Sequence, residues 1–126
     1  MRKLLGLVLA CSLLTACGSE NTPASGTDAG KEFKPDLEVS LDISGDDVTV
    51  TVNTNLVISE EHYGQERKAR EGHIHMYLDN GEKIGVKHAK KVFPDLAPGE
   101  HTLKVSLHNN DHTPYDVTKT IDFVIE

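Results

Sequence analysis

Strict alternation of apolar and polar residues is the feature that most constrains how this chain can fold. It runs through residues 37–43 and 48–52, where every second side chain is leucine, valine or isoleucine. A strand places alternate side chains on opposite faces, so this period of two predicts half-buried β-strands rather than helices. Ser44-Gly45-Asp46 separates the two segments and is typical of a turn. We therefore predict a β-hairpin at the start of the domain.

Five more segments carry strand signals, and turn sequences separate them. These segments are residues 73–79, 83–86, 91–93, 103–107 and 117–125. Asp79-Asn80-Gly81 joins the first two and is typical of a tight hairpin turn. About seven short strands at this spacing are typical of an antiparallel β-sandwich. The sequence therefore predicts an all-β domain of the immunoglobulin-like or fibronectin-III-like architecture.

One corner of the predicted sandwich has a recognisable sequence, which reads Leu96-Ala97-Pro98-Gly99-Glu100-His101-Thr102-Leu103. It resembles the Leu-x-Pro-Gly turn that enters the sixth strand of fibronectin-type sandwiches, where a tyrosine usually follows. His101 stands at the tyrosine position and, by alternation, shares a face with Leu103. We therefore interpret His101 as a structural residue whose imidazole hydrogen-bonds to the backbone, in place of a tyrosine hydroxyl.

A different signal occupies the N-terminus. Met1-Arg2-Lys3 precedes an apolar run, and Leu14-Thr15-Ala16-Cys17 follows that run. The run is shorter than the about 20 residues that span a bilayer, so it is typical of an export signal. The segment resembles the lipobox of bacterial lipoproteins, and this resemblance implies removal of residues 1–16 and acylation of Cys17. The alternative is a plain secretory leader with a chance cysteine.

Without its leader the chain is strongly acidic. Loss of Arg2 and Lys3 lowers Lys plus Arg from 13 to 11 while Asp plus Glu stays at 20, which gives a net charge of −9. This charge disfavours nucleic acid as a partner. The acylated Cys17 would supply the contact with the lipid bilayer, so we expect a cell-membrane protein that faces the extracytoplasmic side. Cys11 lies in the leader, which leaves no pair of thiols for a disulfide.

Composition also divides the chain into parts. Residues 17–35 are polar and rich in small side chains with almost nothing to bury, which predicts a disordered tether. Residues 36–126 suit one small domain. Inside it, Asn55 to Glu71 is highly charged and has no clear period, so we predict a long loop. Loops longer than about 12–15 residues are often functional, although a solvated insertion explains the charge equally well.

The histidines are confined to the stretch from His62 to His112. Histidine is the commonest metal-ligating side chain, so this grouping calls for an explanation. Alternation turns Ile74 toward the core, which places His73 and His75 together on the opposite face of one strand. Two imidazoles that are two residues apart on a strand can reach a common ion.

The predicted topology adds two more imidazoles. In an immunoglobulin-like sandwich, the loop before the third strand and the loop after the sixth lie at the same end. We therefore predict a metal site whose ligands are His73, His75, His108 and His112. The loop over residues 55–71 brings Glu60, Glu61 and His62 close to the same end. His88 follows the fourth strand and has no evident partner.

Ligand chemistry ranks the metals. Three or four imidazoles suit Zn²⁺ or Cu²⁺, and the order of divalent affinities favours copper. Cu⁺ prefers sulfur, and Met76, the one methionine that would remain after removal of the leader, is predicted to be buried. Calcium prefers oxygen ligands, and no Asp-x-Asp loop pattern supplies them. We expect no organic cofactor.

Three motifs occur together in the second half of the chain. They are Gly72-His73-Ile74-His75, Pro98-Gly99-Glu100-His101-Thr102 and Asn109-Asn110-Asp111-His112. Together they resemble small, poorly characterised bacterial extracytoplasmic domains with a Gly-His-x-His strand and a Pro-Gly-x-His-Thr corner. The resemblance covers roughly residues 70–125 and implies an immunoglobulin-like fold with a metal-handling role. The chain also resembles periplasmic copper carriers more loosely, but it lacks their paired methionines and their histidine-led mature N-terminus.

These observations predict a non-enzymatic lipoprotein that binds or buffers Cu²⁺ or Zn²⁺. The main alternative is an interaction module for an envelope protein or a cell-wall component, with incidental or pH-tuning histidines. A metal hydrolase with Glu60 or Glu61 as general base is a third hypothesis. No nucleophile elbow, phosphate-binding glycine loop or His-Glu-x-x-His motif supports an enzyme.

Overall fold

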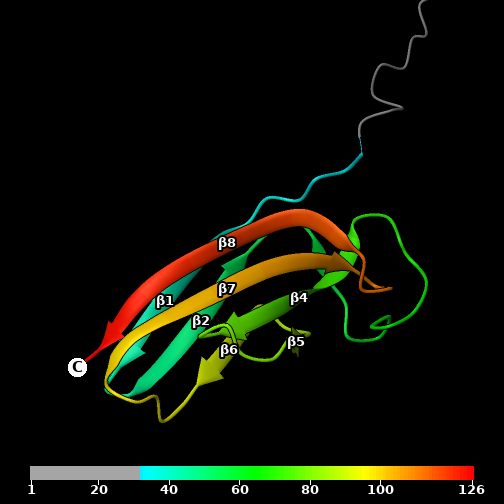
Figure 1. Ribbon diagram of the computed structural model, residues 1–126. Helices are drawn as coiled ribbons and strands as arrows, with labels where there is room; N and C mark the ends of the chain where they lie inside the picture. The colour runs from blue at the N-terminus through cyan, green and yellow to red at the C-terminus, as the bar shows by residue number, and fades with distance from the viewer. Residues whose placement is uncertain (1–31) are drawn as a thin grey trace, which may run out of the picture. The chain divides into compact units, whose positions relative to one another are not determined.

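The computed structural model describes residues 32–126, which form eight β-strands and no helix (Figure 1). The strands are β1 (Glu38–Ser44), β2 (Asp47–Asn53), β3 (Val57–Ile58), β4 (Glu71–Leu78), β5 (Ile84–Val86), β6 (Lys90–Phe93), β7 (Gly99–Asn109) and β8 (Pro114–Ile125). The predicted leader, Cys17 and most of the predicted tether lie outside the described residues and remain predictions. Within the described part, no helix is long and apolar enough to cross a membrane.

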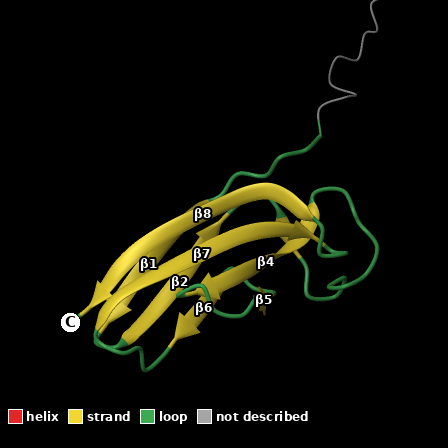
Figure 2. Ribbon diagram, viewed as in Figure 1, coloured by secondary structure: helices red, strands yellow, loops and turns green. Residues whose placement is uncertain are grey.

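Two sheets make up the domain (Figure 2). The smaller has the strand order β1-β2-β6, and the larger has the order β3-β4-β7-β8, with β5 also paired to β4. Neighbouring strands run antiparallel, except that β3 and β4 are parallel. The predicted hairpin is confirmed by the pairing of β1 with β2, in which Leu41 lies opposite Val50. Local alternation therefore identified both strands and their connection.

An aliphatic core joins the two sheets. Every second residue of β2 is buried, as its period of two predicts. Full burial of one such side chain stabilises the fold by about 1.5–3 kcal/mol. The side chains of 0% exposure in this core are Val48, Val50, Ile74, Met76, Leu103, Val105 and Leu107. Because these residues come from both sheets, the core holds β4 and β7, the strands that carry most of the histidines, in fixed positions.

The prediction of a long loop from Asn55 to Glu71 is wrong at two places. Glu71 is the first residue of β4, and Val57 and Ile58 form β3, which pairs with the first two residues of β4. Leu56, only 4% exposed, anchors this short strand in the core. A two-residue strand has no readable alternation, and its partner is distant in sequence, so only the folded chain reveals it. Residues 59–70, here called the charged loop, contain turns and no strand.

The predicted tight turn and the predicted His101 corner lie against each other. Asp79 and Asn80 have φ angles of 52° and 57°, as a tight hairpin turn requires. His101 Nε2–H donates to the Ala97 carbonyl at 2.6 Å, which confirms the predicted backbone hydrogen bond. His101 Nδ1–H donates to the Asp79 carboxylate at 2.7 Å, a partner that the sequence did not indicate. The Ala97 carbonyl, followed by Asp79, raises the pKa of His101.

The packed part of the chain begins slightly earlier than predicted. The Phe33 ring meets Tyr115 edge to face, with ring centroids 6.0 Å apart. The Arg70 guanidinium lies 4.8 Å from the Phe33 centroid. Phe33 belongs to residues 17–35, so the prediction that this segment has almost nothing to bury is wrong at its end. A single aromatic residue has no periodicity, which is why the sequence does not reveal its packing.

Candidate metal centre

Two paired strands place the histidines. β4 runs antiparallel to β7, so the start of β4 lies beside the end of β7. His73 stands directly opposite His108, and His75 stands opposite Ser106. Side chains in such positions are close enough to touch. The predicted juxtaposition of the third and sixth strands at this end of the sandwich is therefore confirmed.

Strand β4 is buried on both faces. Ile74 and Met76 pack into the core, and both are 0% exposed. His73 and His75 lie on the opposite face and are 0% and 2% exposed. Buried polar side chains need hydrogen-bond partners or a ligand. The surroundings of these two imidazoles therefore decide what the site can do.

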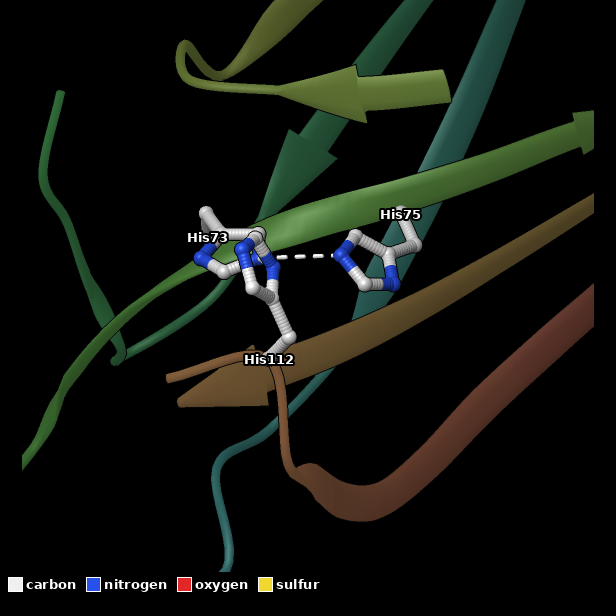
Figure 3. Close-up of side chains that lie close together, drawn as sticks. All are labelled: His73, His75 and His112. Atoms are coloured by element: carbon white, nitrogen blue, oxygen red, sulfur yellow. Dashed lines mark hydrogen bonds between the residues drawn. The ribbon is translucent and has the colours of Figure 1, made fainter. Parts of the chain in front are cut away.

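Three imidazoles converge at the start of β4 (Figure 3). His73 Nε2 lies 2.9 Å from His75 Nε2 and 3.0 Å from His112 Nδ1. The ligand atoms of all three lie within 4.8 Å of one another. Each ring nitrogen of a neutral imidazole carries either one N–H or one lone pair, so His73 Nε2 can complete only one of these two contacts as a full hydrogen bond. Three nitrogens with this spacing are suited to a shared metal ion.

A tight turn between β7 and β8 presents His112. The φ angle of His112 is 70°, in the left-handed region that residues with a β-carbon seldom adopt. The His112 N–H donates to the Asn109 carbonyl at 2.9 Å, and the Asn109 N–H donates to the Thr113 carbonyl at 2.8 Å. These bonds hold the strained backbone in place and so fix the direction of the imidazole. Strain of this kind is concentrated at functional sites.

His108 lies beside the three converging imidazoles with a defined tautomer. Its Nδ1–H donates to the His112 carbonyl at 3.1 Å, so the lone pair is on Nε2 and accepts the Ser106 hydroxyl at 2.9 Å. The His108 ring stacks on His75, with centroids 3.7 Å apart. A backbone carbonyl that orients an imidazole through its other nitrogen is the usual support of a metal ligand. The structure therefore brings all four predicted ligands together and aims three of them at one point.

Burial keeps these imidazoles uncharged. The pKa of His73 is lowered to about 4 and that of His75 to about 3. Burial is the largest cause, and the charge of neighbouring histidines is the next. Burial also lowers the pKa of His108. The three side chains are therefore neutral at neutral pH. Neutral imidazole is the form that binds metal ions.

Two polar atoms of the cluster have no hydrogen-bond partner. They are Nδ1 of His73 and Nδ1 of His75, which are buried and unpaired among the described residues. An unsatisfied buried polar atom costs about 1–3 kcal/mol. They are not the nitrogens that converge, so an ion held by Nε2 of His73 and Nε2 of His75 would leave both Nδ1 atoms without a partner among the described residues.

A second polar network ties the charged loop to β4. The buried Glu71 carboxylate accepts hydrogen bonds from His62 Nδ1–H and from the Asn110 amide, the latter at 3.1 Å. Burial raises the pKa of Glu71, but the bonds from His62 and Asn110 outweigh it, so the net value is lowered. Glu71 is therefore a charged, fixed anchor for the loop. The sequence did not indicate this role, because the partners are far apart in the chain.

The charged loop reaches the site as predicted, but through an unexpected residue. Tyr63 lies over the cluster, with its ring centroid 4.4 Å from that of His73 and 4.9 Å from that of His112. Glu60 instead lies 3.6 Å from His88, which therefore has the partner that the sequence did not reveal. One signal could have identified Tyr63, since it is the only aromatic residue in a highly charged segment.

Comparison with known proteins identifies the architecture. No family model and no curated protein matches the sequence. Among solved structures, the crystal structure of the PKD1 domain of Vibrio anguillarum Epp is similar, with a TM-score of 0.51 and 14% identity. The match covers 76% of this chain and 98% of that chain, and PKD domains have an immunoglobulin-like fold. The described domain is an immunoglobulin-like β-sandwich. At this identity the likeness concerns the fold alone.

Within this immunoglobulin-like sandwich, the nitrogen spacing can be compared with metal geometry. For metal–nitrogen bonds of about 2.0–2.1 Å, tetrahedral ligands lie ~3.3 Å apart and ligands at right angles lie ~2.9 Å apart. The distances from His73 Nε2 to the His75 and His112 nitrogens, 2.9 Å and 3.0 Å, are close to the second value and somewhat below the first. These two spacings are compatible with ligands of a tetragonal Cu²⁺ site or, after a slight separation, of a tetrahedral Zn²⁺ site.

Proposed function

We propose that this protein is a lipid-anchored extracytoplasmic lipoprotein that binds or buffers Cu²⁺ or Zn²⁺. The convergence of three imidazoles, those of the buried His73 and His75 and the partly buried His112, is the observation that carries the proposal. Paired strands and a hydrogen-bonded turn hold these side chains, so little ordering is needed when the ion binds. The lipobox-like sequence at Cys17 supports the anchor.

His108 is the fourth ligand in this proposal. Its lone pair is already on Nε2, and the His112 carbonyl orients the ring. The Ser106 hydroxyl occupies that lone pair at 2.9 Å, so His108 would bind the ion only after its ring turns away from Ser106 toward the three converging nitrogens. Four imidazoles and no sulfur suit Cu²⁺ and Zn²⁺ better than Cu⁺. The site would then be complete without a carboxylate from the charged loop.

Calorimetric titration of the full chain with Cu²⁺ and Zn²⁺ at neutral pH tests the site. We expect one-to-one binding tighter than about 1 μM, which corresponds to a binding free energy of about −8 kcal/mol. A variant with both His73→Gln and His75→Gln should lose this binding. His88→Gln is the matched control and should keep it, because His88 is exposed and pairs with Glu60.

Spectroscopy of the Cu²⁺ complex counts the ligands. Electron paramagnetic resonance should show nitrogen couplings from four imidazoles, reduced to three by His108→Gln. No saturable binding, or equal binding by the double variant, would refute the proposed site. The alternative of a non-enzymatic interaction module would then be favoured, because the immunoglobulin-like fold hosts many such modules. Incorporation of labelled palmitate, lost in Cys17→Ser, tests the anchor separately.

A further inference from the structure

Tyr63 covers the histidine cluster and is fitted closely to its surroundings. Its ring packs on His73 and His112, as described above. Its hydroxyl lies against Gly85, where a β-carbon would be only 2.2 Å from the Tyr63 oxygen. The Lys87 ammonium lies 4.6 Å from the ring centroid, within cation–π range. Gly85 therefore provides the space in which this tyrosine is held over the imidazoles.

The barrier between solvent and the cluster is thin beside Tyr63. An open hollow is lined by residues of the charged loop, His62 and Gly64 among them, and by Asp111. A β-carbon built at Gly64 would lie 3.8 Å from His112 Nε2. Gly64 therefore borders both the hollow and a ring of the cluster. Movement of this one segment would open a route to the metal ligands.

Tyr63 and Gly64 make one backbone N–H bond each, whereas the neighbouring His62 is anchored to Glu71. The Tyr63 N–H donates to the Glu60 carbonyl at 3.3 Å, beyond the usual range, and the Gly64 N–H donates to the Asn110 carbonyl at 2.8 Å. Gly64 has a φ of 79°, a conformation that glycine adopts without strain. The strands that carry His73 and His108 are instead joined by a continuous ladder. The cover can therefore move while His73, His75 and His108 keep their positions.

We propose that Tyr63 is the gate of the metal site, and that its ring must swing off His73 and His112 before a divalent transition-metal ion enters or leaves. This inference rests on the proposed metal-binding function. Tyr63 meets the ligand rings through its own ring and supplies no ligand atom, so it controls the rate of exchange and not the affinity. Gly85 is part of the gate, because any β-carbon there displaces the tyrosine hydroxyl.

Exchange kinetics test the gate. Tyr63→Ala removes the ring, and Gly85→Ala displaces it without altering Tyr63 or any ligand. Stopped-flow loading with Cu²⁺ and removal by EDTA should both be at least about tenfold faster in these variants, with Kd changed less than about threefold. Tyr63→Phe should exchange like the parent. Tyr77→Ala is the matched control, because its ring contacts Lys104 at 5.0 Å. Unchanged rates in Tyr63→Ala would overturn the proposal.

A second measurement does not depend on metal binding. Diethyl pyrocarbonate acylates accessible neutral imidazoles, and peptide mass spectrometry locates the products. The fully buried His73 should react slowly in the EDTA-treated parent and at least about tenfold faster in Tyr63→Ala and Gly85→Ala. The exposed His88 should react equally fast in all of them. Equal rates at His73 would show that Tyr63 is no gate. Unmasked imidazoles that bind no metal would instead refute the proposed function, while the cover itself would be established.

Discussion

The metal-free protein is expected to lose stability steeply as the pH falls from 7.5 to 5. In the folded chain the pKa of His73 is about 4 and that of His75 is about 3, whereas the ordinary value is 6.5. Below pH 6.5 the unfolded chain therefore binds two protons that the folded chain does not accept until much lower pH. The state that binds more protons gains relative stability as the pH falls, so folding becomes less favourable.

The size of this effect follows from the same pKa values. One unit of pKa difference corresponds to about 1.4 kcal/mol. Lowering the pH from 7.5 to 5 therefore costs about 2 kcal/mol for each histidine, and about 4 kcal/mol for the pair. The lowered pKa of His108 acts in the same direction. Against a typical unfolding free energy of about 5–15 kcal/mol, such a loss is large.

Guanidinium unfolding in EDTA at half-unit steps from pH 7.5 to pH 5 measures this dependence. The His73→Gln, His75→Gln double variant should lose about 4 kcal/mol less than the parent over this range. Comparison of the two proteins at each pH cancels the contributions of all other titrating groups. His88→Gln, an exposed substitution, should follow the parent. If parent and double variant showed the same slope, the two imidazoles would not be buried and neutral, and the reasoning from burial would be wrong.

Three further predictions concern the framework of the site. His101→Ala should lower the melting temperature and leave metal affinity unchanged; because the pKa of His101 is raised above 6.5, the loss should be largest at or below pH 6.5 and should shrink as the pH rises past the raised value. Gly72→Ala should prevent normal folding or abolish metal binding in circular dichroism and titration experiments, because the new β-carbon would lie 1.9 Å from the His108 carbonyl oxygen. Leu103→Ala should cost about 2–5 kcal/mol in chemical unfolding, with unchanged metal affinity in the folded protein, because the side chain is fully buried in the core.

The fold was largely predictable because its strands carry their own signals. Alternation identified β1 and β2. The positive φ angles of Asp79 and Asn80 occur at the turn that Asp79-Asn80-Gly81 predicted. β3 was missed because two residues cannot display a period. Phe33 was missed for a related reason, since the packing of one aromatic side chain depends on Tyr115, which is remote in the chain.

The sequence predicted which histidines lie at the candidate site, but not how their side chains are arranged there. The sequence by itself determined which strands form and which histidines share an end of the sandwich, because alternation and connectivity are properties of local sequence. Only the tertiary structure decided that His73, His75 and His112 converge while His108 turns toward Ser106. It also decided that Tyr63 covers them. These features depend on cross-strand register and on the packing of a loop without periodicity, and both arise from contacts between residues far apart in the chain.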